Sequence, residues 1–95
     1  MDIQSFRDSV RSDTPPDGLD RALQALWQDA KGNWDAAHQL AQAQDDATGA
    51  WVHAYLHRVE GDLANAGYWY RRAGKPASSA PLKEEWDEIA TALLD

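Results

Sequence analysis

The stretch that decides the fold runs from Trp51 to Pro76 and reads WVHAYLHRVEGDLANAGYWYRRAGKP. Apolar and small residues recur at helical spacing on both sides of Gly61 and Asp62. Glycine accepts the left-handed conformation that ends a helix, and aspartate is a favoured residue at the start of the next one. The stretch is therefore predicted to form two short helices that fold back on each other.

This stretch, called the aromatic–basic hairpin below, differs in composition from the rest of the chain. Four basic and two acidic residues give it a charge of +2, whereas the whole chain carries −7 and the remainder therefore −9. It also holds five of the nine aromatic residues and two of the three histidines. Such a charge asymmetry favours a contact between the hairpin and an acidic partner.

Length and composition argue against several classes of protein. The 95 residues are enough for one domain, and the absence of cysteine excludes disulfides, thiolate metal sites and cysteine nucleophiles. No apolar run approaches the roughly 20 residues of a membrane span, and the N-terminus lacks the pattern of a signal peptide. The negative net charge argues against nucleic-acid binding. We therefore expect a soluble cytoplasmic protein with no nucleic-acid or membrane partner.

Apolar residues recur at helical spacing along the whole chain, and no alternation typical of strands is present. The predicted fold class is all-α, a compact bundle of about five helices in a single domain of residues 1–95. Asp17, Asn33 and either Asp46 or Thr48 are the predicted helix caps. The predicted segments are a short helix 2–11, a linker 12–17, helical hairpins 18–44 and 49–73, and a C-terminal helix 82–94.

Two turn segments repeat 29 residues apart, GNWDAA at 32–37 and GDLANA at 61–66. The residues that follow the tetratricopeptide order of small, turn, aromatic and proline positions are Ala54, Gly61, Asp62, Ala66, Tyr70, Ala73 and Pro76. The chain thus resembles the tetratricopeptide and Sel1-like repeat families, although its period is shorter than the usual ~34 residues. The resemblance implies stacked helical hairpins that bind peptides or proteins along a concave face. The segment HAYLHRVEGDLANAGYWYRRAG also resembles a group of small bacterial proteins, and no particular activity follows from this resemblance.

The repeat frame predicts which residues of the third hairpin helix line the groove. Trp51, Tyr55 and Arg58 lie at i, i+4 and i+7 and share one face. Two aromatic rings and a guanidinium suit an acidic peptide or another carboxylate ligand. The alternative is that Trp51 and Tyr55 pack in the core, as large aromatic residues of small domains commonly do.

The histidines form a second pattern on a neighbouring face. His53, His57 and Glu60 are also spaced at i, i+4 and i+7, and two histidines one turn apart can bind zinc, with Glu60 or His38 as a third ligand. The spacing lacks the internal glutamate of the H-E-x-x-H motif. A structural, hydrogen-bonding role is therefore favoured, and we predict no metal site and no cofactor.

Four basic residues of the hairpin offer an anion site if the two helices bring them together: Arg58, Arg71, Arg72 and Lys75. The alternative is that Arg71 and Arg72 only stabilise the negative end of their helix.

The function predicted from these patterns is a non-enzymatic module that binds a protein or peptide with acidic or carboxylate groups through residues 51–76. The predicted binding residues are Trp51, Tyr55, His57, Arg58 and Arg71. An open groove with exposed Trp51 or Tyr55 would favour this interpretation. A homo-oligomer is compatible with the sequence.

The alternative is a small anion-binding protein or a small enzyme. Its polar pocket would be formed by His53, His57, Arg58, Glu60 and Arg71. Phosphate-loop and nucleophile-elbow motifs are missing, which favours a protein without enzymatic activity. A cavity on which His57, Arg58 and Glu60 converge would favour the alternative.

Overall fold

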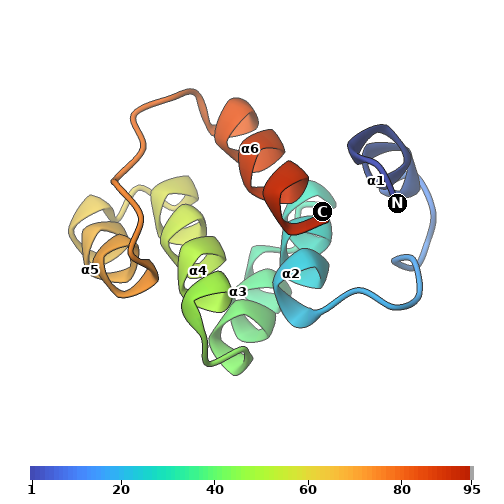
Figure 1. The fold of residues 1–95 in the computed structure, drawn as a ribbon. Coiled ribbons are helices and arrows are strands. Elements are labelled where there is room, and N and C mark those ends of the chain that lie inside the picture. Colours follow the sequence, from blue (N-terminus) through green and yellow to red (C-terminus); the bar gives the residue numbers. More distant parts are fainter. Residues whose placement is uncertain (95) are drawn as a thin grey trace.

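The computed structural model describes residues 1–94, and these form six helices and no strand (Figure 1). The helices are α1 (Ile3–Ser9), α2 (Arg21–Ala30), α3 (Trp34–Ala43), α4 (Ala47–Val59), α5 (Leu63–Ala73) and α6 (Leu82–Leu94). The all-α prediction is confirmed. The number is six rather than about five: α1 corresponds to the short helix predicted at 2–11, the next four helices to the two predicted hairpins, and α6 to the C-terminal helix.

The turns between helices follow from residues that stop one helix and begin the next. Gly32 and Gly61 have φ of 88° and 86°, in the left-handed region that glycine adopts without strain. Asp46 and Asp62 then cap α4 and α5, since their carboxylates accept hydrogen bonds from backbone N–H groups three residues later, at 2.8 and 3.1 Å. Sharp turns of this kind bring successive helices side by side.

Two predicted caps differ from the observed ones. The carboxylate of Asp20, rather than Asp17, accepts the hydrogen bond from Leu23 N (2.9 Å), so α2 begins at residue 21 rather than near 18. Asn33 does occupy the position before α3, but its side chain makes no capping bond and donates to Gln28 Oε1 instead. Both differences are local, because several polar residues at each turn compete for the same role.

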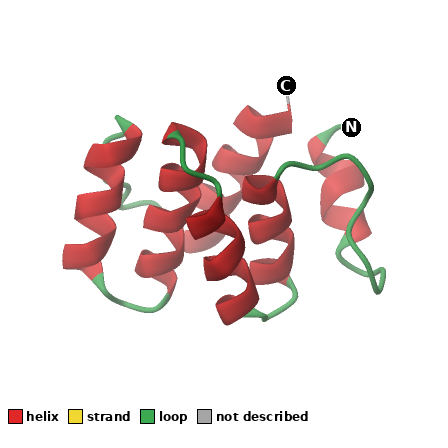
Figure 2. Cartoon of the chain, turned by 90° about the horizontal axis from the view of Figure 1, so that it is seen from below, coloured by secondary structure: helices red, strands yellow, loops and turns green. Residues whose placement is uncertain are grey.

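The core is built around α4, which packs against α2, α3, α5 and α6 (Figures 1 and 2). All nine residues from Gly49 to His57 are buried. A helix surrounded in this way needs small or apolar residues on every side. Gly49 illustrates the constraint: a Cβ there would lie 1.9 Å from the carbonyl oxygen of Gln44. Side chains on α4 are therefore positioned by neighbours from almost the whole chain.

The C-terminal helix returns across α4 and α2, whereas α5 packs chiefly against α4 at one edge of the molecule (Figure 1). Trp86, Ile89 and Ala90 form the buried stripe of α6. The Trp86 indole donates a hydrogen bond to Leu26 O (2.9 Å) and stacks on Phe6 at 5.5 Å between ring centroids. The long loop between α5 and α6 thus carries the chain back across the molecule. As a result, α6 packs on α4 and α2 instead of continuing outward beyond α5.

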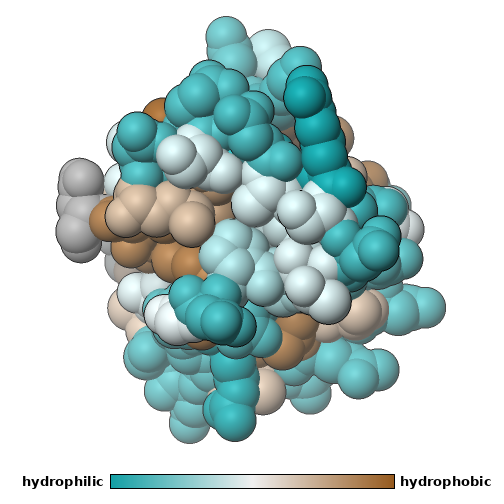
Figure 3. Space-filling view, turned by 90° about the vertical axis from the view of Figure 1, so that its right-hand side faces the viewer, coloured by the Kyte–Doolittle hydropathy of each residue, from teal (hydrophilic) through white to brown (hydrophobic). Residues whose placement is uncertain are grey.

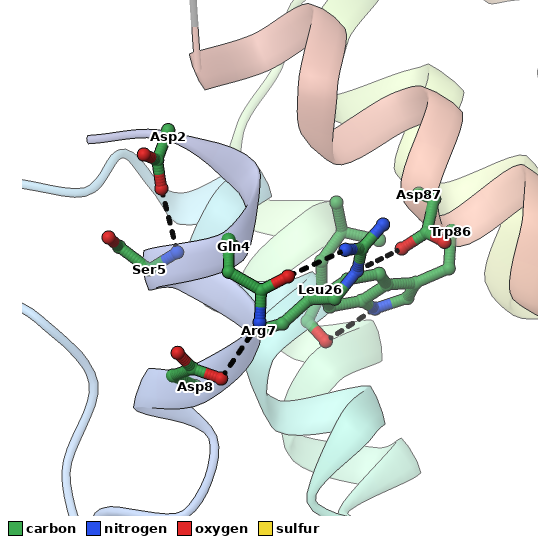
Figure 4. A network of polar contacts seen from close by, with 8 residues as sticks. All are labelled: Asp2, Gln4, Ser5, Arg7, Asp8, Leu26, Trp86 and Asp87. Carbon is green, nitrogen blue, oxygen red and sulfur yellow. Dashed lines mark hydrogen bonds and ion pairs between the residues drawn. The ribbon is translucent and has the colours of Figure 1, made fainter.

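At the other edge, α1 contacts α6 through a small polar network (Figure 4). Arg7 Nε donates to Asp87 Oδ1 at 2.9 Å, and Asp2 caps the short helix by accepting from Ser5 N at 2.8 Å. The face that carries α1 is mostly hydrophilic, and hydrophobic residues show through it in small separate areas (Figure 3). Across residues 1–94, none of the helices combines the length and the apolarity that crossing a membrane requires.

Candidate functional site

The two aromatic residues predicted to line an open groove are buried. Trp51 is 9% exposed and Tyr55 is 4% exposed. Both belong to α4, which packs against α6, and Trp51 lines a surface hollow together with Leu93, Tyr55 another together with Trp86. Among the residues that the structure describes, the expected open groove at Trp51 and Tyr55 is therefore not found. The apolar stripe of α6 needs a surface to pack on, and this side of α4 supplies it.

Arg58 is held by the same helix. Its guanidinium donates from Nη1 to Glu85 Oε1 (2.5 Å) and from Nη2 to Ala80 O (2.6 Å). Tyr70 donates its hydroxyl to the other oxygen of Glu85, and burial, followed by this bond, raises the pKa of Tyr70. The carboxylate expected from a partner at Arg58 is therefore supplied by the chain itself, and it fixes α6 to α4 and α5.

The three histidines of the chain meet at the junction of α3, α4 and α5. His53 Nε2 and His38 Nε2 are 2.9 Å apart, and the His53 and His57 rings stack at 4.8 Å between centroids. Two indoles enclose the group: Trp69 stacks on His53 at 3.8 Å and Trp34 on His38 at 4.9 Å. We call His38, His53 and His57 the histidine cluster.

Within the cluster, the two nitrogens of His57 have different surroundings. His57 Nδ1 lies 2.6 Å from Glu60 Oε1, so the carboxylate orients the ring. His57 Nε2 is buried and has no hydrogen-bond partner. A buried polar nitrogen without a partner is uncommon in folded proteins, because its desolvation is uncompensated. This nitrogen is therefore available to an added ligand.

Burial also shifts the protonation of the other two rings. Burial, then the charges of His38, His57 and Arg72, lowers the pKa of His53 to about 4 from its ordinary value of 6.5. Burial, then His57, lowers the pKa of His38. Both imidazoles are neutral at pH 7 as a result, and each carries one nitrogen able to accept a bond.

Acid should destabilise the protein through His53. Between pH of about 6.5 and about 4, the unfolded chain binds a proton at His53 that the folded chain does not bind. The contribution of neutral His53 to the free energy of unfolding is therefore complete above this window, and it is lost as the pH falls through it. We expect a loss of about 1–2 kcal/mol, since a cleft beside His53 lessens the desolvation. Urea unfolding in metal-free buffer at both ends of the window, with His53→Gln as the reference, measures it. Equal acid losses in the two proteins would contradict the prediction.

The residues predicted to form the polar pocket of the alternative interpretation lie in three separate places. His53, His57 and Glu60 come together and gain His38 as a neighbour. Arg58 instead bonds to Glu85, and Arg71 lies on the exposed side of α5. A catalytic or anion-binding group needs its charged members to converge. The arrangement therefore does not form the predicted pocket.

A separate cleft of about 370 Å³ lies between α1, α2 and α6, with Tyr55 in its wall. The Tyr55 hydroxyl donates to Asp29 Oδ2 (3.3 Å), and burial raises the pKa of Asp29. Arg7 and Asp87 pair with each other at its rim. Because these polar groups already bond to one another, we assign no ligand to this cleft.

Several side chains along α5 remain exposed to solvent. We call Leu63, Tyr68, Arg71 and Arg72 the α5 face; Leu63 is 68% and Tyr68 45% exposed. The Arg72 guanidinium lies over the rings of Trp69 (5.0 Å) and Tyr68 (5.8 Å) and donates to the Tyr68 hydroxyl (3.1 Å). The guanidinium of Arg72 and the exposed ring of Tyr68 are thus held together at the surface.

Two residues that shape these sites were absent from the predicted set. Glu85 was missed, although a single acidic residue within the apolar stripe of α6 is an available signal. Tyr68 is one of the five aromatic residues of the hairpin, and its place beside Arg72 depends on the packing of α5. Comparisons of this chain with models of protein families, with curated proteins and with solved structures found no match.

Proposed function

We propose that this protein is a non-enzymatic interaction module that binds an acidic protein or peptide segment on the α5 face. The observation that carries the proposal is the exposed stack of Arg72 on Tyr68 and Trp69 beside Arg71. A guanidinium held by an aromatic ring is preorganised for a carboxylate, and tyrosine and arginine are enriched among residues that dominate binding. Preorganised side chains lose little conformational entropy on binding.

The charge distribution supports an acidic partner. The α5 face and Lys75 belong to the aromatic–basic hairpin, which carries +2 on a chain of −7. Its cations attract a negatively charged segment, while the acidic remainder of the chain repels that segment from other faces. Leu63 and Tyr68 add apolar surface whose burial would persist when salt weakens the charge attraction.

We further propose that α2–α3 and α4–α5 are two tetratricopeptide-like hairpins. The glycine-led turns that repeat after 29 residues support this frame, although that period is shorter than the usual ~34 residues. In such a frame α2 and α4 line the concave side, and α6 packs against both. The partner therefore contacts the outer helix of the second hairpin rather than the concave side.

The proposal changes the roles of the predicted binding residues. Arg71 remains a contact residue, because it is exposed on the α5 face. Trp51, Tyr55, His57 and Arg58 become supports that hold α4 and its neighbours in place, since each is buried or bonded inside the chain. The interaction thus depends on them only through the fold.

Removing the cations of the α5 face should abolish capture of an acidic partner. We expect Arg71→Ala/Arg72→Ala to weaken binding at least about tenfold, because two charge-assisted contacts are lost. Proteins retained from lysate by the immobilised chain at low and high salt are identified by mass spectrometry, and the acidic segment of the retained protein is titrated by calorimetry.

The matched control is Arg11→Ala/Arg21→Ala, which removes the same charge from exposed positions away from α5. The control should bind like the wild type, and Tyr68→Ala should weaken binding at high salt. Equal losses in both double variants would mean that net charge alone drives capture, and unchanged binding in the α5 variant would place the partner elsewhere. Either result would contradict the proposal.

A further inference from the structure

The histidine cluster has the composition and convergence of a metal site. All three histidines of the chain contribute, two from successive turns of α4 and one from α3. One ring nitrogen from each lies within 4.8 Å of the other two. Neutral imidazole is a preferred ligand of Zn²⁺. Residues held on packed helices define such a site more precisely than residues on loops do.

The buried nitrogen of His57 is an independent sign of a missing ligand. His57 is 5% exposed, and its Nε2 has no partner among the described residues. Its other nitrogen is held by Glu60 at 2.6 Å. A histidine that ligates a metal commonly bonds through its second nitrogen to a carboxylate, which fixes the ring and raises its basicity. Glu60 and His57 already have this arrangement, with Nε2 free for a metal.

We propose that His38, His53 and His57 bind one Zn²⁺ ion through a ring nitrogen each, with His57 using Nε2 and Glu60 orienting it. This reverses the prediction of no metal site made from the sequence. Zinc–nitrogen distances of about 2.0–2.1 Å place tetrahedral ligand atoms about 3.4 Å apart. The 2.9 Å between His38 Nε2 and His53 Nε2 must therefore open by about 0.5 Å.

The surroundings of the cluster suit an ion that enters from solvent. His53 and Trp69 line a cleft of about 250 Å³ together with Asp45 and Asp46 of the α3–α4 turn. Arg72 lines the same cleft, so two carboxylates and one guanidinium give it a net negative charge, which attracts a cation. Trp34 stacks on His38 and Trp69 on His53, and this packing restricts the orientations of these two imidazoles. Three ligands from the chain leave the fourth position of the ion to water or to an outside group.

The first test uses the wild-type chain and Zn²⁺ alone. After removal of metal with a chelator, calorimetric titration should give one Zn²⁺ per chain, and Co²⁺ should give the strong visible absorption of a tetrahedral site. At a free Zn²⁺ concentration 100 times the Kd, Tm should rise by about 10 °C or more. Absence of stoichiometric binding would overturn the proposal whether or not any variant folds.

Variants then locate the ion. His38→Ala, at a half-buried position, should abolish the Zn²⁺-dependent rise in Tm, and Glu60→Gln should weaken Zn²⁺ about 10–100-fold. Asp62→Asn is the control, because asparagine preserves the α5 cap while removing a carboxylate close to His57 and Glu60. Binding that survives His38→Ala, or that Asp62→Asn weakens as strongly, would place the ion on the alternative group of His57, Glu60 and Asp62 and overturn the proposal.

Discussion

Replacing Arg58 with alanine should lower the free energy of unfolding by about 3–5 kcal/mol. The substitution leaves the carboxylate of Glu85 buried with only the Tyr70 hydroxyl as a side-chain partner. A buried charge that loses its counter-ion is among the largest single-residue losses of stability, whereas a matched apolar replacement of the whole pair is often neutral. Urea unfolding followed by circular dichroism measures the loss.

Two further variants distinguish a buried ion pair from a surface one. Arg58→Met/Glu85→Leu should recover much of the stability that Arg58→Ala loses, because no charge remains buried. Arg7→Ala removes the exposed Arg7–Asp87 pair, which also joins a basic residue to α6, and should change stability little. If Arg58→Ala and Arg7→Ala had equally small effects, α6 would not be held by Glu85.

The second large effect is expected at Trp86. Trp86→Ala should cost about 3–5 kcal/mol, since a buried indole that packs between α1, α2 and α6 is lost and a cavity remains. Trp86→Phe should cost less, because the ring stacked on Phe6 persists while the bond to Leu26 O is lost (Figure 4).

Thermal and urea unfolding of the Trp86 variants provide the measurement. Leu63→Ala is the control, because Leu63 is a large hydrophobic residue that is exposed, and its loss should change stability by no more than about 0.5 kcal/mol. A loss below about 1 kcal/mol for Trp86→Ala would show that α6 does not pack on α2 as described.

The all-helical class could be predicted because it depends on local patterns. Apolar spacing marks the helices, and residues such as Gly32 and Gly61 mark their ends with a conformation that few other residues adopt. The start of α2 was predicted too early, because Asp17 and Asp20 both precede the apolar pattern and either can cap a helix. Only the packed structure selects Asp20.

The position of α6 could not be predicted from its sequence. Its apolar stripe shows that α6 must pack on something, but it fits either the α2–α4 side or the outer side of α5 equally well. The choice decides which aromatic residues are buried. Because α6 covers α4, Trp51 and Tyr55 enter the core while Tyr68 stays exposed.

Only part of the histidine cluster could be predicted from the sequence. The spacing of His53 and His57 shows that they share one face of a helix. That His38 is the residue that joins them depends on how α3 packs on α4, which local spacing does not encode. The stacking of Trp34 and Trp69 around the rings depends on the same packing.

The most direct test of the proposed binding surface is amide hydrogen exchange of the chain with and without the acidic segment that it captures. We predict slower exchange in α5 and the adjoining turn at Gly74, with exchange in α6 unchanged. Slower exchange in α2 and α4 together with faster exchange in α6 would contradict the account. That result would mean that the partner displaces α6 and contacts Arg58 and Tyr55.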